Sequence, residues 1–189
     1  SGKIYINGKE VDIKNPMDAV KHGIGYLSED RKRYGIVVGK SVAENSTMAT
    51  MDQFMSGAFI NKKKERAIAQ KYVDSLKTKT PNVDQLVVNL SGGNQQKVVI
   101  AKWLVRNCDI LIFDEPTRGI DVGAKSEIYH LMNELVAAGK SIIMISSEMT
   151  EILRMSDRII VMCEGRVTGE IGIEEETQER IMHAATLRK

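Results

Sequence analysis

The chain has 189 residues, a length that fits one domain with a small insertion. Hydrophobic residues make up 42% of the sequence and charged residues 28%, so the chain can bury a core beneath an ordinary polar surface. The formal net charge of +2 excludes a field strong enough to favour nucleic acid or an anionic membrane. The two cysteines, Cys108 and Cys163, lie 55 positions apart without a second pair, which argues against a disulfide scaffold or a zinc finger and indicates a reducing compartment.

No apolar stretch approaches the roughly 20 residues that a membrane-spanning helix needs. The first residues, Ser-Gly-Lys-Ile-Tyr, also lack the apolar centre of a secretory signal. We therefore expect a soluble, cytosolic protein.

The first predicted elements are a hairpin, a short helix and a strand. Residues 4–13 alternate between apolar and polar side chains around an Asn-Gly pair, the strongest short signal for an antiparallel hairpin. Residues 18–22 predict a helix that ends at a glycine, and 24–27 predict a strand. Residues 28–40 are charged and contain two glycines, which indicates a loop.

The middle of the chain, residues 42–88, is predicted to be helical and more polar. Asn61 is expected to cap a helix that runs to Leu76. Three methionines recur at i, i+3 and i+7: Met48, Met51 and Met55. A core stripe is the favoured interpretation of these methionines, and a docking surface for a partner is the alternative.

The second half of the chain alternates apolar strands with helices. Residues 98–105 are apolar nearly all round, which predicts a buried helix. The further predicted elements are strand 110–113, a helix from Asp121 to Gly139, strand 142–145, helix 148–155, strand 159–162 and an amphipathic helix over 174–187. Continuously apolar strands between helices indicate a parallel sheet covered on both faces.

An acidic pair, Asp114 and Glu115, ends the predicted strand 110–113. The carboxyl ends of buried parallel strands are where such sheets bind ligands. Asp114 could hold Mg²⁺, which prefers oxygen ligands, and Glu115 could orient or deprotonate a water that attacks a phosphate. The alternative is an acidic pair that only initiates a helix before Pro116.

A second motif, Leu-Ser-Gly-Gly-Asn-Gln-Gln-Lys at residues 90–97, opens the buried helix. Gly92 and Gly93 leave backbone N–H groups unobstructed, and the amino end of a helix attracts an anion. Ser91 adds a hydroxyl donor. The alternative is that Ser91 is a plain N-cap followed by flexible glycines.

Together the two motifs resemble those of the ATP-binding-cassette (ABC) family of transporter ATPases, and the resemblance covers nearly the whole chain. Leu-Ser-Gly-Gly matches the family's signature motif, residues 110–116 its Walker B strand, 119–121 its D-loop and 157–167 its closing hairpin. The residues at 28–35, 90–97 and 145–148 are most similar to those of monosaccharide (ribose/galactose-type) importers. In these importers two cassettes are fused, and the chain resembles the second, C-terminal one.

The resemblance implies an α/β fold, with a P-loop NTPase-like (ABC ATPase) parallel sheet flanked by helices, a helical subdomain and an N-terminal antiparallel β hairpin. It also implies four regions. Residues 1–41 would form the antiparallel β segment and the Q-loop region, and 42–90 the helical subdomain. Residues 91–173 would hold the signature helix and the α/β ATPase core, and 174–189 a C-terminal helix.

The sequence departs from the family pattern in one missing loop and at two residues. No Gly-x-x-x-x-Gly-Lys-Ser/Thr loop occurs, because the nearest stretch, 35–41, is one residue short and β-branched in its middle. We therefore expect a fold truncated at the N-terminus, without its Walker A segment, and an isolated chain that is inactive. Glu29 stands where the family usually has its Q-loop glutamine. Ser147 stands at the switch-histidine position, and serine cannot shuttle a proton as imidazole does.

The resemblance also implies a role for each candidate residue. The catalytic positions are Glu115, Ser147 and the D-loop residue Asp121. Asp114 is the metal ligand, and Glu29 occupies the Q-loop position. Four signature residues complete the ATP site of a partner cassette: Ser91, Gly92, Gly93 and Asn94. The signature residues act on the partner because the family's dimer is head-to-tail.

The implied function is to bind and hydrolyse ATP with Mg²⁺ and to couple hydrolysis to monosaccharide uptake, as a peripheral protein on the cytoplasmic face of the cell membrane. The implied partners are an N-terminal cassette of the same polypeptide or a second cassette, membrane permease subunits and, indirectly, a sugar-binding protein, with no nucleic acid. Residues 31–34 and the three methionines are candidates for the permease contact.

Two other functions stay open. A non-catalytic dimerisation or regulatory cassette would only complete a partner's ATP site. A soluble cassette protein acting on nucleic acid is disfavoured by the net charge of +2.

Overall fold

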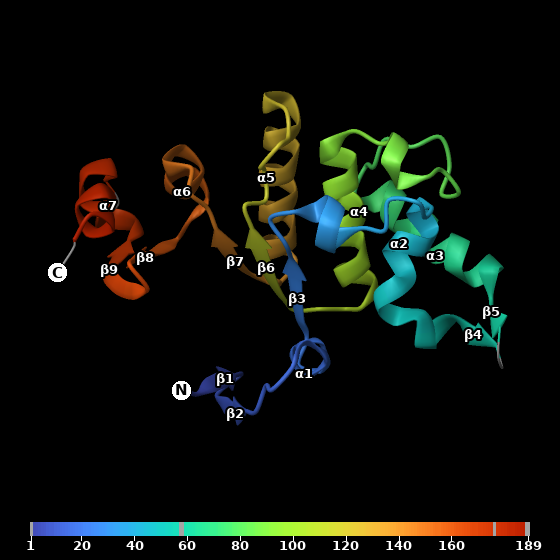
Figure 1. Cartoon of the computed structure of the whole chain (residues 1–189), viewed down its shortest axis with the longest axis horizontal. Helices are drawn as coiled ribbons and strands as arrows, with labels where there is room; N and C mark the ends of the chain where they lie inside the picture. The colour runs from blue at the N-terminus through green and yellow to red at the C-terminus, as the bar shows by residue number, and fades with distance from the viewer. Residues whose placement is uncertain (1, 57–58, 176, 188–189) are drawn as a thin grey trace. The chain divides into compact units, whose positions relative to one another are not determined.

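The computed structural model describes residues 2–56, 59–175 and 177–187 (Figure 1). It divides into two compact units, residues 1–143 and 144–189. Residues 1, 57–58, 176 and 188–189, which belong to the predicted N-terminal, helical and C-terminal regions, lie outside the described residues. The division into four regions stays a prediction.

The predicted N-terminal hairpin is confirmed. Strand β1 (Ile4–Ile6) pairs antiparallel with β2 (Lys9–Val11). Asn7 and Gly8 have φ values of 51° and 75°, the left-handed conformation that a two-residue hairpin turn requires. The predicted short helix and strand follow as α1 (Pro16–Lys21) and β3 (Ile24–Leu27).

The predicted loop over 28–40 contains a five-residue π-helix, η1 (Arg31–Gly35). The Asp30 carboxylate caps this helix by accepting a backbone N–H at 3.1 Å. From a later helix, the buried Lys102 ammonium donates to the carbonyl of Gly35 at 2.7 Å. The helix was not predicted because bonds from distant residues, rather than its own sequence pattern, hold it in place.

The middle region is helical, as predicted, but it is interrupted by a small hairpin. Its elements are α2 (Val42–Thr47), the 3₁₀ helix η2 (Met48–Phe54), the antiparallel strands β4 (Met55–Ser56) and β5 (Phe59–Ile60), α3 (Lys62–Ser75) and the 3₁₀ helix η3 (Val87–Asn89). Asn61 caps α3 as expected, because its side chain accepts the backbone N–H of Lys64 at 3.0 Å.

The methionine stripe is not a core stripe. Met51 and Met55 are each 46% exposed, so the favoured interpretation is wrong for these two residues, and Met48 is half-buried. Residues 48–54 form a 3₁₀ helix that breaks at Thr50 (φ −136°, ψ 30°). An α-helical period therefore does not align the three side chains on one face.

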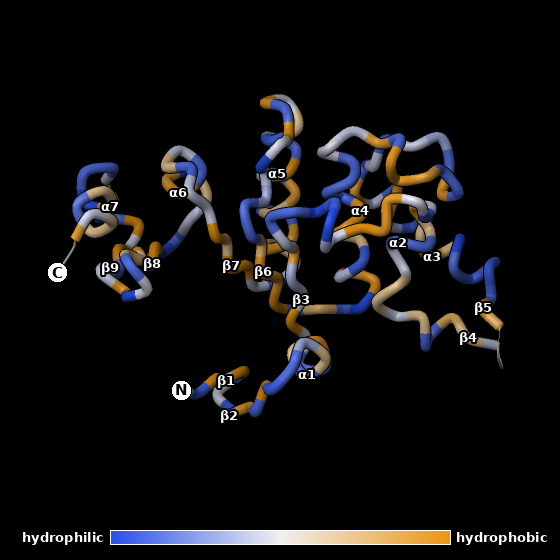
Figure 2. Tube along the Cα trace, viewed as in Figure 1, coloured by the Kyte–Doolittle hydropathy of each residue, from blue (hydrophilic) through white to orange (hydrophobic). Residues whose placement is uncertain are grey.

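The core of the first unit is built around one strand. β6 (Ile110–Asp114) is the middle strand of the order β3-β6-β7, and it pairs parallel with β3. Leu111 and Phe113 are fully buried, and the strand is hydrophobic up to its last residue, Asp114 (Figure 2). β7 (Ser141–Ile145) is less buried than its apolar sequence indicates, since Ile143 is 53% exposed.

Two long helices accompany this sheet. α4 (Gly92–Val105) is the predicted buried helix, and Val98, Val99 and Ile100 are at most 1% exposed. α5 (Val122–Ala137) begins after Asp121 as predicted and packs against α4.

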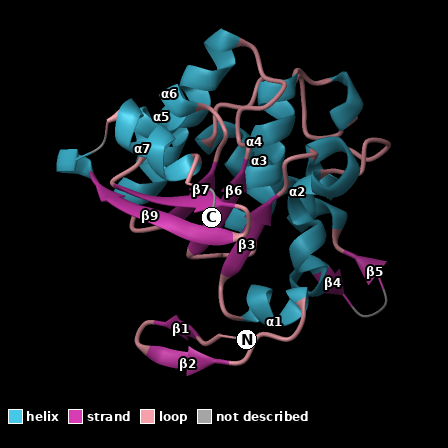
Figure 3. Ribbon diagram, turned by 60° about the vertical axis from the view of Figure 1, so that its left-hand side comes forward, coloured by secondary structure: helices cyan, strands magenta, loops and turns pink. Residues whose placement is uncertain are grey.

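The second unit is a hairpin with helices. β8 (Arg158–Cys163) and β9 (Arg166–Gly172) form an antiparallel pair (Figure 3). The other elements are α6 (Met149–Met155), the 3₁₀ helix η4 (Ile173–Glu175) and α7 (Gln178–Ala185). The predicted tail helix begins later than expected, because the Thr177 hydroxyl accepts the N–H of Arg180 and caps α7 there. Among the described helices, none combines the length and apolarity that crossing a membrane requires.

The contact between α4 and α5 depends on a glycine. A Cβ atom added at Gly93 would lie 2.9 Å from the Cβ of Ala124. We expect Gly93→Ala to lower the free energy of unfolding by about 1–3 kcal/mol through overpacking, as measured by urea denaturation. The control is Gly123→Ala, whose added Cβ would meet no atom closer than 3.4 Å and should leave stability unchanged or slightly higher. Equal stability of the two variants would contradict this packing.

Because of the buried ammonium of Lys102, the free energy of unfolding varies with pH in the alkaline range. Burial lowers the pKa of Lys102 from 10.5 to about 8. Between these values the unfolded chain binds more protons than the folded chain, so this group makes the free energy of unfolding rise as the pH increases through that window. Lys102→Met should remove this rise, whereas Lys32→Met, at an exposed lysine, should retain it. Denaturation at pH 8 and pH 10 measures the difference, and identical pH profiles for Lys102→Met and the unchanged chain would refute it.

Candidate functional site

The predicted acidic residues gather at one edge of the sheet in the first unit. β3 and β6 are parallel neighbours, so their carboxyl ends lie at the same edge. Asp114 is the last residue of β6 and Glu115 follows it, while Glu29 lies two residues beyond the end of β3. The parallel pairing therefore brings the candidate metal ligand, the candidate base and the Q-loop position to one edge.

Asp114 is held by a residue that the sequence analysis did not identify. The hydroxyl of Tyr26 donates to Oδ2 of Asp114 at 2.6 Å. This hydrogen bond, together with partial burial and the charge of the carboxylate, raises the pKa of Tyr26 above its usual value of 10. Tyr26 pairs in register with Ile112, two residues before Asp114. This register, which the sequence pattern does not encode, places Tyr26 beside Asp114.

The oxygen donors at this edge fit a metal ion only if water and substrate phosphates supply its other ligands. Within residues 2–56, 59–175 and 177–187, no cluster of three or more His, Cys, Asp or Glu side chains could hold a metal ion. Asp114 supplies one carboxylate, of which one oxygen is bonded to Tyr26. Mg²⁺ is commonly bound through one or two carboxylates, waters and substrate phosphates, so Asp114 fits Mg²⁺ that arrives with a nucleotide.

Glu115 has an unusual backbone conformation. Its φ is 46°, in the left-handed region that non-glycine residues seldom adopt. The backbone N–H of Arg118 donates to the carbonyl of Glu115 at 3.1 Å and closes a turn directly after β6. Backbone of this kind costs of order 1–3 kcal/mol and concentrates at functional sites.

The Q-loop position is joined to the turn that follows Glu115. Glu29 forms an ion pair with Arg118, and both side chains are largely exposed. An exposed pair of this kind contributes about 0–1 kcal/mol, so it orients Glu29 more than it stabilises the fold.

Arg31 connects three segments of the site. Its guanidinium donates to the carbonyl oxygens of Arg118 at 2.9 Å and Gly119 at 3.3 Å, and to the side chain of Gln95 on α4 at 3.4 Å. Partial burial lowers the pKa of Arg31. A Cβ added at Gly92 would lie 2.7 Å from this guanidinium and 3.1 Å from the carbonyl of Gly119. Arg31 therefore brings the Q-loop, signature and D-loop segments together, whereas the sequence indicated only a permease contact for it.

The amino end of α4 has unbonded donors. In the part of the chain that the structure describes, no acceptor is bonded to the backbone N–H groups of Gly92, Gly93 and Asn94. Ser91 occupies the N-cap position but makes no side-chain capping bond, unlike a plain N-cap. Ser91 is exposed and Gly92 half-buried, whereas Gly93 is buried against α5. The accessible part of this motif is therefore smaller than the sequence suggested.

The two remaining catalytic candidates lie in different units. The carboxylate of Asp121 accepts the N–H of Ala124 at 2.9 Å and caps α5. Ser147 belongs to the second unit, where it is exposed just after β7. The catalytic roles of both residues stay predictions.

The glycine-containing stretch 35–41 does not have the structure of a phosphate-binding loop. Its Lys40 ammonium lies 3.2 Å from the carboxylate of Glu44, and its Ser41 forms a capping box with Glu44 at the start of α2. The stretch follows η1 rather than a strand, unlike a phosphate-binding loop between strand and helix.

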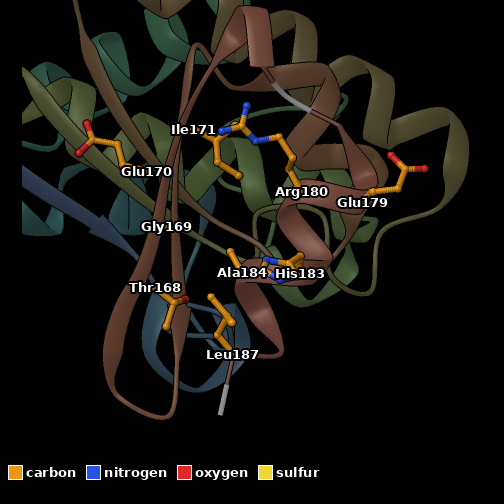
Figure 4. A pocket seen from close by; sticks show the side chains of 9 residues that line it. All are labelled: Thr168, Gly169, Glu170, Ile171, Glu179, Arg180, His183, Ala184 and Leu187. Carbon is orange, nitrogen blue, oxygen red and sulfur yellow. The ribbon is translucent and has the colours of Figure 1, made fainter. Parts of the chain in front are cut away.

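The second unit contains a cavity of about 400 Å³ between β9 and α7 (Figure 4). Two of its charged side chains are paired, Glu170 with Arg158 and Arg180 with Glu175. None of the predicted site residues lines this cavity.

Comparison with known proteins identifies close relatives. A protein-family model described as ABC transporter matches residues 1–118. A putative ribose/galactose/methyl galactoside import ATP-binding protein of Burkholderia lata is 59% identical over the whole chain, and a xylose import ATP-binding protein of Thermoanaerobacter pseudethanolicus is 58% identical over 98% of it. The chain spans 37% of the length of each of these two relatives.

Solved structures share the fold. An ATP-binding cassette of an ABC transporter superposes with a TM-score of 0.80 at 22% identity, covering 97% of this chain and 76% of that one. A dimeric ATP-binding cassette in a post-hydrolysis state superposes with a TM-score of 0.72 at 22% identity, covering 92% of this chain and 74% of that one. The predicted ATPase cassette fold, with its sheet, helices and N-terminal hairpin, is confirmed.

The bond from Tyr26 to Asp114 should be visible in an alkaline titration. Because the folded-state pKa of Tyr26 is raised, its stabilising contribution is present below pH 10 and is lost as the pH rises through that higher value. Tyr26→Phe should remove from the ultraviolet titration at 295 nm a phenol whose pKa lies above 10. If the phenol that Tyr26→Phe removes ionises at or below pH 10, the bond is disproved.

Proposed function

Because the chain belongs to the ABC transporter family, we propose that it is the C-terminal cassette of the ATP-binding subunit of a monosaccharide importer. Relatives named for the import of ribose, galactose and methyl galactoside, or of xylose, support this proposal. The observation that carries it is the meeting, around Arg31, of the segment after Glu29, the amino end of α4 and the backbone at Gly119.

At its own acidic edge the chain provides groups for phosphoryl transfer to water. ATP and Mg²⁺, when bound, supply the transferable phosphoryl group and neutralise its charge. Asp114 would hold the Mg²⁺ through the carboxylate that Tyr26 orients. The carboxylate of Glu115 would orient the attacking water and accept its proton. Glu29, held by Arg118, would lie at the same edge.

At the amino end of α4 the chain would complete the ATP site of a partner cassette. The unbonded N–H of Gly92 and the hydroxyl of Ser91 are donors for a terminal phosphate, and the helix end favours a negative charge. A head-to-tail pair of cassettes would bring this end to the partner's nucleotide.

We propose that the chain's own site turns over slowly. A carboxylate at Glu29 adds negative charge near the phosphate, and Ser147 has no imidazole to shuttle a proton. Hydrolysis there also needs a phosphate-binding loop from outside residues 1–189, because Lys40 and Ser41 of the nearest stretch are paired with Glu44. The isolated chain is therefore expected to be inactive.

The surface that would meet the permease subunits can be narrowed. Lys32, Arg33 and Tyr34 are exposed, whereas Arg31 is directed to the backbone of the first unit. The exposed Met51 and Met55 supply an adaptable apolar contact. We propose that these residues dock on membrane subunits at the cytoplasmic face of the membrane. A sugar-binding protein would then be an indirect partner, through those subunits, and nucleic acid would not be a partner.

A second candidate function is a non-catalytic cassette that only completes the partner's site. The departures at Glu29 and Ser147 favour it, because they weaken the chain's own site and leave the amino end of α4 unchanged.

The trans-acting role can be tested by mixing. The chain is added to a separately purified cassette that carries a Gly-x-x-x-x-Gly-Lys-Ser/Thr loop, and ATP hydrolysis is followed against chain concentration. We expect the rate to rise, and Ser91→Arg to abolish the rise by filling the phosphate position. Ser126→Arg, at an exposed serine of α5, is the matched control and should retain it. A rise that survives Ser91→Arg would refute the role.

The two candidate functions differ at Glu115. Within the assembled importer, Glu115→Gln should lower turnover at this chain's own site by about 100-fold or more if that site hydrolyses ATP. Single-turnover measurements resolve the two sites. An unchanged pair of rates would establish the non-catalytic alternative instead.

A further inference from the structure

We infer that Asn94 is a positioning residue that acts through Ser91 and keeps the Ser91 hydroxyl proton directed away from the protein, available to an anionic phosphate oxygen. This inference rests on the proposed function of the amino end of α4. It changes the role expected for Asn94, from a group that contacts the nucleotide to one that orients the group that does.

Two hydrogen bonds determine which way the Asn94 amide faces. The backbone N–H of Lys79 donates to Oδ1 of Asn94 at 2.8 Å. Because a backbone N–H can only donate, its partner must be the carbonyl oxygen of the amide. The NH₂ group therefore faces Ser91, and Nδ2 lies 2.8 Å from Oγ of Ser91.

The direction of the bond between Asn94 and Ser91 determines where the hydroxyl proton of Ser91 can point. An amide NH₂ can only donate, so Oγ of Ser91 is the acceptor in this pair. The hydroxyl proton is then left to donate elsewhere, and no acceptor for it occurs among the described residues. An exposed hydroxyl whose oxygen is occupied and whose proton is available suits an anion better than a neutral or cationic group.

The turn that holds Asn94 is itself anchored. The buried ammonium of Lys97, one turn further along α4, donates to the carbonyl of Lys77 at 3.1 Å and to the carboxylate of Glu127 on α5 at 2.8 Å. The bond from Lys97 lowers the pKa of Glu127, so the carboxylate stays ionised. The ammonium of Lys79 lies 3.5 Å from the same carboxylate. The N–H of Lys79 is thus presented by a turn fastened to both long helices.

A double-mutant cycle in the mixed-cassette assay tests the assignment. Ser91→Ala removes the hydroxyl and should lower the stimulated ATP hydrolysis about ten- to hundred-fold, the loss typical of a hydrogen bond to a charged group. Asn94→Leu keeps the size of the side chain without its polar atoms and should cause a comparable loss. If Asn94 acts only through Ser91, the double variant should be no slower than Ser91→Ala alone, within about two-fold.

Amide hydrogen exchange supplies a readout that is independent of activity. Asn94→Leu should speed exchange of the Lys79 amide, whereas Ser91→Ala should leave it unchanged. Asn82→Leu is the matched control, because Asn82 also accepts a backbone N–H, that of Asp84 at 3.0 Å, but does not contact Ser91. It should affect neither ATP hydrolysis nor exchange at Lys79.

The outcomes separate this inference from the proposed function. If Ser91→Ala leaves the stimulated rate unchanged, the trans-acting proposal itself is overturned, and the inference with it. A second outcome is that Ser91→Ala slows the reaction and that Asn94→Leu lowers the rate by the same factor in the unchanged chain and in the Ser91→Ala variant. In that case only the assignment of Asn94 is overturned. Unchanged exchange at Lys79 in Asn94→Leu would also overturn that assignment.

Discussion

The close approach of three backbone segments around one guanidinium underlies the candidate site. Arg31 can reach the carbonyls of Arg118 and Gly119 only because Gly92 has no side chain in the way. Burying part of a guanidinium is costly unless its donors are bonded, and here they bond two backbone oxygens and Gln95. The same contact places the amino end of α4 beside the loop that follows β6. A displacement of Arg31 would therefore affect both the amino end of α4 and the segment at Arg118 and Gly119.

α4 extends this coupling along its length. Gln95, Val99 and Lys102 are spaced i, i+4 and i+7, so they lie on one face of the helix. Gln95 accepts from Arg31, Val99 lies 3.1 Å from where a Cβ of Gly35 would be, and Lys102 donates to the carbonyl of Gly35. The short π-helix η1 is thus fastened at both ends to the helix that carries the signature motif. The proposed permease contact at Lys32–Tyr34 would lie within η1, which these bonds join to α4.

Local patterns predicted the elements well where the chemistry is local. The Asn-Gly turn, the Asn61 cap and the apolar run before Asp114 each depend on neighbouring residues, and each is confirmed. The pattern misled at Met51 and Met55, because a 3₁₀ helix does not follow the α-helical period. The π-helix η1 was missed for the complementary reason, since its stability comes from bonds to Arg31 and Gly35 made by residues far along the chain.

The sequence by itself determined which chemical groups this protein has: an acidic pair after a buried strand, a serine and two glycines before a buried helix, and departures at Glu29 and Ser147. Each of these can be read because it is a matter of residue type and spacing. Only the tertiary structure decided what those groups face. The bond from Tyr26 to Asp114, the pairing of Glu29 with Arg118 and the amide orientation of Asn94 join residues that are distant along the chain or depend on a backbone N–H from another turn. Hydrogen bonds of this kind require a defined distance and direction, which spacing along the sequence does not encode.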